Sequence, residues 1–201
     1  NELYEKVCKF SSYLKKLNLQ KGDRVAAYVP NKIETIICFL ACAKNGIIWS
    51  SCSPDFGAQG VVDRFKQIEP KVFITCDYYY YNGKKINILD KVEKILKQIP
   101  SIKKVIAFNY NKQERESLKN FINFEETLKN DLDEVFERFE FNHPIYILFS
   151  SGTTGKPKCI THGSGNVLIE HNKEFMLHCD IRESEKLFYY TTTGWMMWNW
   201  F

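Results

Sequence analysis

Short apolar runs alternate with segments of helical periodicity along most of the chain, and this alternation limits the fold more than any other feature. The apolar runs have the length of buried strands and occupy residues 24–29, 47–50, 72–75, 104–108 and 145–149. Between them, apolar residues recur three or four positions apart, as on one face of a helix, at residues 3–17, 30–45, 59–68, 90–98 and 165–179. The alternation predicts an α/β domain with a doubly wound, largely parallel sheet.

Three segments rich in glycine and hydroxyl residues are expected at one edge of this sheet. They are residues 53–57, 150–158 and 191–195, and the first two directly follow predicted strands. Ligands of open α/β sheets bind beyond the carboxyl ends of the strands. The three segments are therefore predicted to form a common binding site.

Residues 150–158 read Ser-Ser-Gly-Thr-Thr-Gly-Lys-Pro-Lys and predict a phosphate-binding loop. Glycines that adopt positive φ let successive backbone N–H groups point at one anion, and hydroxyls and ammonium groups add donors and charge. The predicted phosphate ligands are Ser150, Ser151, Gly152, Thr153, Thr154, Gly155, Lys156 and Lys158. A P-loop of the ATPase and GTPase kind is excluded, because only two residues separate the glycines and Pro157 stands where a hydroxyl is required. The alternative is a flexible polar loop between a strand and a helix.

This loop, together with the stretch from Tyr189 to Trp200, resembles the signatures of the adenylate-forming superfamily, which includes the acyl-CoA synthetases. The resemblance covers nearly the whole chain and is weakest at residues 109–141. It implies an incomplete large N-terminal AMP-binding domain with three regions: a βα-repeat region at 1–108, a surface helix and linker at 109–143, and a phosphate-loop and acyl-pocket region at 144–201. It also implies that the Thr-rich turn at 191–193 follows a strand.

The resemblance implies a reaction in two halves. A carboxylate attacks the α-phosphate of ATP in the presence of Mg²⁺ to form acyl-AMP and pyrophosphate, and the thiol of CoA then displaces AMP. Within the superfamily, residues 191–199 and 53–57 are most similar to the branch that activates acetoacetate. An acetate- or propionate-activating ligase and a noncatalytic nucleotide-binding paralogue are the alternatives, and zinc binding by a helix is a third.

The resemblance also assigns residues to the acyl and CoA sites. Thr193, Gly194, Trp195, Met196 and Met197 match the stretch that walls the acyl pocket, and Lys84 matches a basic position near the CoA nucleotide. The other interpretations are a tryptophan-rich core for residues 195–200 and a solvated lysine for Lys84. No catalytic residue is assigned, because the family's magnesium-linked glutamate, ribose-binding aspartate and C-terminal lysine lie beyond Phe201. The chain alone is expected to be inactive.

Composition limits the possible partners. Twenty-eight basic and 24 acidic residues give a net charge of +4, too balanced to indicate nucleic acid. Apolar stretches fall short of the roughly 20 residues of a membrane span. Seven cysteines without a C-x-x-C spacing indicate neither a disulfide framework nor a zinc ribbon and suit a reducing compartment, so a soluble, cytosolic protein is expected. An upstream targeting segment stays open.

Four residues near the end of the chain have metal-binding or ligand-binding alternatives. His171, Glu174 and His178 would share one face of a helix over 165–179, but the first and third lie about 10 Å apart along its axis, and the HExxH order is missing. A solvated helix face is therefore favoured over a zinc site. His162 follows the phosphate loop and either contacts a ligand or is paired with the backbone.

Overall fold

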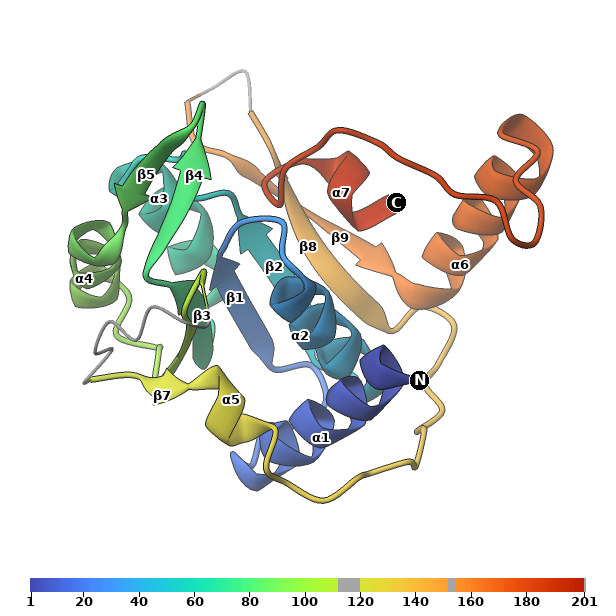
Figure 1. Cartoon of the computed structure of the whole chain (residues 1–201), viewed down its shortest axis with the longest axis horizontal. Helices are drawn as coiled ribbons and strands as arrows, with labels where there is room; N and C mark the ends of the chain where they lie inside the picture. The colour runs from blue at the N-terminus through green and yellow to red at the C-terminus, as the bar shows by residue number, and fades with distance from the viewer. Residues whose placement is uncertain (112–119, 152–154, 201) are drawn as a thin grey trace.

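The fold is described from a computed structural model that covers residues 1–111, 120–151 and 155–200. Its sheet has seven strands in the order β7-β6-β3-β1-β2-β8-β9 (Figure 1). Their bounds are β1 (Arg24–Tyr28), β2 (Ile48–Cys52), β3 (Val72–Cys76), β6 (Lys104–Phe108), β7 (Ile122–Asn123), β8 (Pro144–Ser150) and β9 (Lys158–Gly163). All neighbouring strands are parallel except β8 and β9, so the predicted largely parallel sheet is confirmed.

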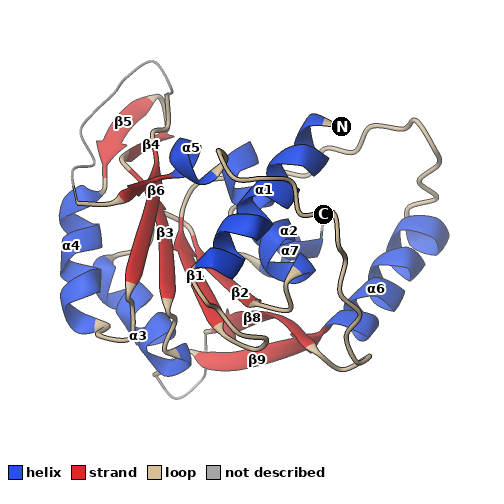
Figure 2. Cartoon of the chain, turned by 90° about the horizontal axis from the view of Figure 1, so that it is seen from below, coloured by secondary structure: helices blue, strands red, loops and turns tan. Residues whose placement is uncertain are grey.

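Helices cover both faces of this sheet. The helical elements are α1 (Glu2–Lys16), α2 (Ile33–Lys44), α3 (Ala58–Ile68), α4 (Leu89–Gln98), α5 (Phe124–Thr127), α6 (Ser164–Lys173), the π-helical turn η1 (Glu174–His178) and α7 (Met196–Trp200). The connection from β1 to β2 runs one way across the sheet and that from β2 to β3 runs back, so right-handed crossovers place α2 and α3 on opposite faces. Figure 2 shows α3 and α4 on one side of the sheet and α1 and α2 on the other, as a doubly wound domain requires.

The central strands are buried almost completely. Every residue of β2 and β3 is buried, and only Arg24 of β1 is not. Parallel strands with helices on both faces need mostly apolar side chains in both directions, which explains why these runs do not alternate with charged residues. Trp49, Phe73 and Tyr146 are among the fully buried side chains, and each large apolar side chain that leaves water contributes about 1.5–3 kcal/mol.

Lys44 introduces a buried charge at the end of α2. Its side chain is 1% exposed, and its ammonium donates to the Ser11 hydroxyl at 3.2 Å, to the Asp133 carboxylate at 3.0 Å and to the Val135 carbonyl at 2.7 Å. Lys15 also pairs with Asp133, at 2.8 Å. Burial opposes the ionisation of Asp133, but hydrogen bonds from Lys15 and Lys44 outweigh it and lower its pKa to about 2. These contacts attach the segment around Asp133 to α1 and α2.

Asp133→Asn is expected to lower the free energy of unfolding by about 1–2 kcal/mol at pH 7, allowing for screening by solvent. Because folding lowers the pKa of Asp133, its contribution is complete above about pH 4 and disappears as the pH falls toward 2. Urea unfolding of both proteins at pH 7, 5, 4 and 3 should show the difference shrinking with acidity. Asp131→Asn removes an exposed carboxylate two residues away and is the control. A difference that is constant over this range would contradict the ion-pair explanation.

The structure corrects the expectations after residue 150. The strand-to-helix connection considered for the phosphate loop is wrong, because the loop joins β8 to the antiparallel edge strand β9. The strand implied before the Thr-rich turn is also missing: among the described residues, 181–192 pair with no strand, and Phe188 and Tyr190 are 85% and 78% exposed. A single helix is expected from the sequence over 165–179. In the structure the α-helix α6 ends at Lys173, and the π-helical turn η1 continues from Glu174 to His178.

Two further differences concern the middle of the chain. Strands β4 (Tyr78–Tyr81) and β5 (Lys84–Asn87) form an unpredicted hairpin, whose Asn82-Gly83 turn has positive φ at both residues, as a tight hairpin turn requires. In the region expected to hold a surface helix and linker, the described residues include β7 and the single turn α5, whose Phe124 is buried. Residues 112–119 lie outside the described part.

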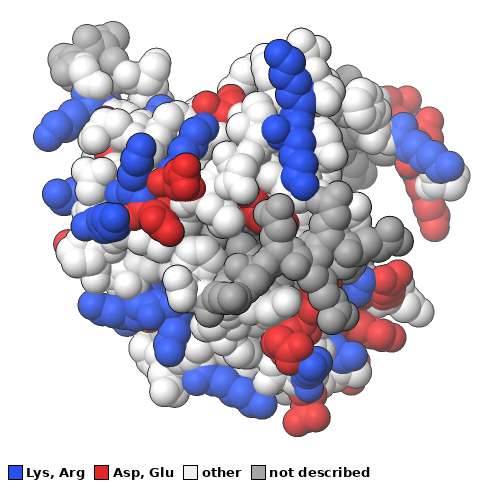
Figure 3. Space-filling view, turned by 60° about the vertical axis from the view of Figure 1, so that its left-hand side comes forward, with Lys and Arg blue, Asp and Glu red and all other residues white. Residues whose placement is uncertain are grey.

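Charged side chains are interspersed over the face shown in Figure 3. Lys and Arg lie among Asp and Glu there, and the described residues in this view form no continuous basic surface. None of the helices in the described ranges is long and apolar enough to cross a membrane.

Candidate substrate-binding site

The Thr-rich turn packs against the carboxyl ends of β1 and β2. The buried hydroxyl of Thr193 donates to the Val29 carbonyl at 2.6 Å, and the hydroxyl of Ser51 donates to the Thr193 carbonyl at 2.7 Å. A Cβ on Gly194 would lie 3.2 Å from both the Ser53 backbone nitrogen and the Phe56 ring, so the close approach favours glycine. Segments 53–57 and 191–195 therefore contact each other at this edge of the sheet, as expected from the sequence.

The phosphate loop begins at the same edge. Ser150, at the end of β8, pairs with Lys158, at the start of β9. Gly155 has φ of +102°, a conformation that L residues rarely adopt, and Ser151, Lys156 and Lys158 are exposed. Gly152, Thr153 and Thr154 lie outside the described residues. The described part thus offers one positive-φ glycine and two exposed ammonium groups near a strand end, which suits an anion.

Gln67 of α3 holds the base of this loop. Its side-chain amide donates to the carbonyl of Pro157 at 2.9 Å and to that of Asp63 at 2.7 Å, and the thiol of Cys159 lies 3.6 Å from its amide oxygen. The sequence did not identify Gln67, because nothing local to α3 indicates that it meets a segment 90 residues later.

Of the predicted acyl-pocket residues, Met196 and Met197 begin helix α7, and Trp195 directly precedes it. Trp195 and Met196 are 57% and 45% exposed, and Met197 is partly buried. Later in the same helix, the buried Trp198 donates its indole N–H to the side chain of Asn31 at 2.9 Å. The helix therefore presents its first residues outward while Trp198 attaches it to the segment after β1.

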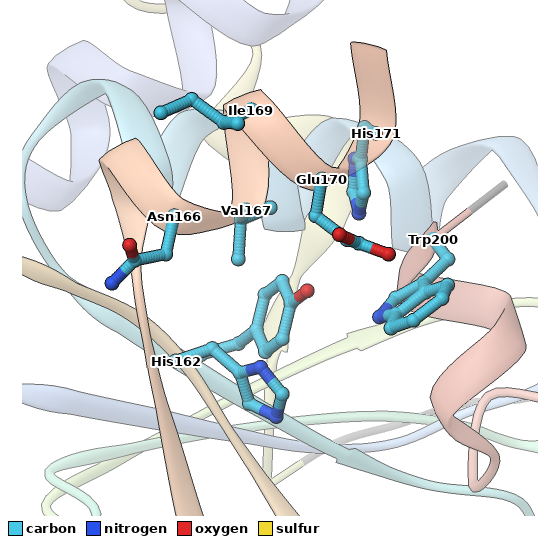
Figure 4. A pocket seen from close by; sticks show the side chains of 8 residues that line it. His162, Asn166, Val167, Ile169, Glu170, His171 and Trp200 are labelled. Carbon is cyan, nitrogen blue, oxygen red and sulfur yellow. The ribbon is translucent and has the colours of Figure 1, made fainter. Parts of the chain in front are cut away.

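Two adjoining cavities lie behind α7. The smaller, of about 350 Å³, is lined by Tyr146, His162, Asn166, Val167, Ile169, Glu170, His171 and Trp200. The larger, of about 650 Å³, is mostly apolar and shares Val167, His171 and Trp200 with it. Figure 4 shows Glu170 and His171 extending from α6 and Trp200 from α7, across from His162 on β9. Sequence patterns placed Tyr146 only within a buried strand.

Two other predictions concern Lys84 and the possible metal ligands His171, Glu174 and His178. Lys84 is exposed at the start of β5, opposite Tyr81. Glu174 and His178 lie in η1 and His171 in α6, and the π-helical turn removes the constant helical phase that would align them. No group of three His, Cys, Asp or Glu among the described residues is suited to hold a metal ion.

His162 faces the smaller cavity. Its ring lies against that of Tyr146 in a tilted arrangement with centroids 4.9 Å apart, and burial lowers the pKa of His162. A neutral imidazole is therefore favoured at pH 7. Its position agrees with the ligand-contacting alternative more closely than with a histidine that only meets backbone.

The fold is an α/β domain in which the β8–β9 loop and the Thr-rich turn lie at the carboxyl edge of the parallel strands. A family model described as "AMP-binding enzyme" matches residues 1–199, and the chain belongs to this family of AMP-binding enzymes. The resemblance identified in the sequence is thereby confirmed.

Acetoacetyl-CoA synthetases are among the relatives of this chain. The chain is 47% identical to the acetoacetyl-coenzyme A synthetase of Rhizobium meliloti, with 100% of the chain aligned to 31% of that protein. It is 42% identical to the acetoacetyl-CoA synthetase of Mus musculus, over 99% of the chain and 31% of the relative. The solved structure of acetoacetyl-CoA synthetase from Streptomyces lividans matches with a TM-score of 0.94 at 40% identity, over 99% of this chain and 30% of that one. The chain therefore spans about a third of the length of these relatives.

Proposed function

We propose that the chain is part of an ATP-dependent, AMP-forming acid–CoA ligase that activates acetoacetate. The observation that carries the proposal is the attachment of Thr193 and Gly194 to the ends of β1 and β2, at the same sheet edge from which the β8–β9 loop leaves. This arrangement brings an anion-binding loop and a candidate acyl segment together. The identity of 47% and 42% to acetoacetyl-CoA synthetases supports the choice of acid.

In the first half-reaction, the loop would hold the β- and γ-phosphates of ATP. Negative charge accumulates on pyrophosphate as the acid attacks the α-phosphate, and fixed N–H groups, hydroxyls and the ammonium groups of Lys156 and Lys158 stabilise it. Gln67 positions the loop through the Pro157 carbonyl. Trp195, Met196 and Met197 would orient the acid, whose alignment with the phosphate lowers the entropic part of the barrier.

In the second half-reaction, the thiol of CoA attacks the acyl carbonyl and AMP leaves. Lys84, exposed on the β4–β5 hairpin, would attract the phosphates of the CoA nucleotide. Small molecules are thus the proposed partners. Five of the seven cysteines are buried and all are free thiols, which agrees with a cytosolic location.

Mg²⁺ would accompany ATP as a substrate complex. The described residues do not by themselves make a magnesium site, because they contain no cluster of three acidic, histidine or cysteine side chains. Its chemistry, when bound, is to neutralise charge on the phosphates.

Exchange of labelled pyrophosphate into ATP by the full-length enzyme tests the proposal. We expect exchange that depends on an added acid and is fastest, in kcat/KM, with acetoacetate rather than acetate or butyrate, because the first half-reaction is reversible without CoA. Faster exchange with acetate would show that the chain belongs to an acetate-activating ligase instead. Nucleotide binding without exchange for any acid would indicate a noncatalytic paralogue.

A further inference from the structure

The smaller cavity contains a buried hydroxyl that has no hydrogen-bond partner among the described residues. The side chain of Tyr146 is 0% exposed, and its hydroxyl makes no hydrogen bond to any described residue. Burial raises the pKa of Tyr146 to about 12, and the neighbouring indole of Trp200 offsets only part of this rise without reaching good hydrogen-bond geometry. The phenol therefore keeps its proton and can donate it. Buried polar groups are nearly always paired, so an unpaired donor that lines a cavity is available to a water or to a ligand atom.

A second unpaired polar atom lies in the same cavity. Nε2 of His171 is buried without a hydrogen-bond partner in the described structure, and its ring lies between Trp200 and Phe175, with centroids 6.1 and 5.9 Å away. Burial lowers the pKa of His171, which favours a neutral ring with one N–H donor. The cavity thus combines two donors with a mostly apolar surrounding, the usual character of a small-molecule pocket.

The electrostatic setting favours a neutral oxygen over an anion. Glu170 also lines the cavity, and its carboxylate pairs with Lys173 at 2.8 Å. This carboxylate disfavours a second anion nearby, and the ion pair leaves no excess positive charge to attract one. A carbonyl oxygen that accepts hydrogen bonds from Tyr146 and His171 meets these requirements.

The strand register connects this cavity to the phosphate loop. Tyr146 pairs with His162, and Ser150 pairs with Lys158 four residues along the same ladder. Residues four apart on a strand lie on one face of the sheet, about 13 Å from each other. On α7, Met196 and Trp200 are also four residues apart and lie on one helix face. The cavity that Tyr146 and Trp200 line therefore lies on the same sheet face as the base of the loop and on the same helix face as Met196.

We propose that the Tyr146 hydroxyl, with His171, receives the 3-oxo oxygen of the acid and selects a 3-oxo acid over the saturated acid of the same length. The assignment rests on the proposed adenylation function and names the residues that determine its specificity. A saturated acid would leave both donors unpaired in the pocket, which is the condition under which polar sites reject an analogue strongly.

Tyr146→Phe in the full-length enzyme tests this assignment, because it removes one oxygen and conserves the ring. We expect the ratio of kcat/KM for acetoacetate over butyrate to fall roughly ten- to a hundredfold. The melting temperature of the unliganded variant should stay the same or rise, because an unpaired buried hydroxyl is replaced by an apolar edge. His171→Leu should lower the same ratio, and Tyr4→Phe, an exposed tyrosine on α1, should leave it unchanged.

The outcomes separate this assignment from the function it rests on. If the wild-type enzyme activates acetoacetate and Tyr146→Phe keeps its preference, the assignment is wrong and adenylation stands. Equal losses for acetoacetate and butyrate would show that Tyr146 only supports packing and would also overturn it. If the wild-type enzyme activates neither acid, it is the proposed function that fails.

Discussion

Lys158→Ala and Thr153→Val are each expected to slow adenylation in the full-length enzyme by roughly ten- to a hundredfold, an effect on kcat rather than only on the KM for the acid. Lys158 starts β9 opposite Ser150, and its ammonium is exposed where the loop leaves the sheet. Its charge would act on pyrophosphate, which becomes more negative in the transition state, and interactions that strengthen there raise the rate. Thr153 lies outside the described residues, and its role follows from the loop sequence.

Single-turnover formation of acyl-AMP and pyrophosphate exchange measure this effect directly. Lys16→Ala removes an exposed lysine of α1 and is the charge-matched control. Unfolding midpoints of all variants should agree closely, because an exposed lysine contributes little to stability. If wild type and both variants exchange pyrophosphate at the same rate, the loop does not bind the phosphates of ATP.

Trp195→Gly is expected to shift the substrate preference from acetoacetate to longer unbranched acids, by roughly tenfold or more in relative kcat/KM. The proposed role of the indole is to limit the depth of the acyl pocket, and the side chains of Met196 and Met197 adapt to different chain lengths. Trp195 is 57% exposed in this chain, so its removal should cost little stability, whereas Gly194 and Thr193 keep the turn attached to the sheet.

A series of unbranched acids from two to eight carbons, assayed with wild type and variant, measures the shift. Tyr190→Ala removes a more exposed aromatic side chain close by, 78% exposed, and should leave the series unchanged. A variant that loses activity equally toward every acid would show that Trp195 positions α7 and does not set the pocket depth.

Apart from the β4–β5 hairpin, the order of the strands and helices in the first half of the chain followed from local patterns. Buried parallel strands such as β2 and β3 have apolar residues on both faces, whereas α3 and α4 each have one apolar face. The spacing of apolar residues along the sequence therefore distinguishes the strands from the helices. The glycines and hydroxyls at 150–158 predict a phosphate loop from sequence alone, because the groups that would bind phosphate lie in adjacent residues.

Tertiary contacts decided what local patterns do not contain. Strand β9 has largely exposed residues and no apolar period, and it becomes a strand only because β8 offers an open edge. The Thr193 hydroxyl meets a carbonyl 164 residues earlier. Tyr146 meets His162 across the β8–β9 hairpin, and it shares a cavity with His171 only because α6 lies beside that hairpin. Nothing near Tyr146 in sequence distinguishes it from an ordinary core tyrosine, since whether its hydroxyl finds a partner depends on residues brought to it by the fold.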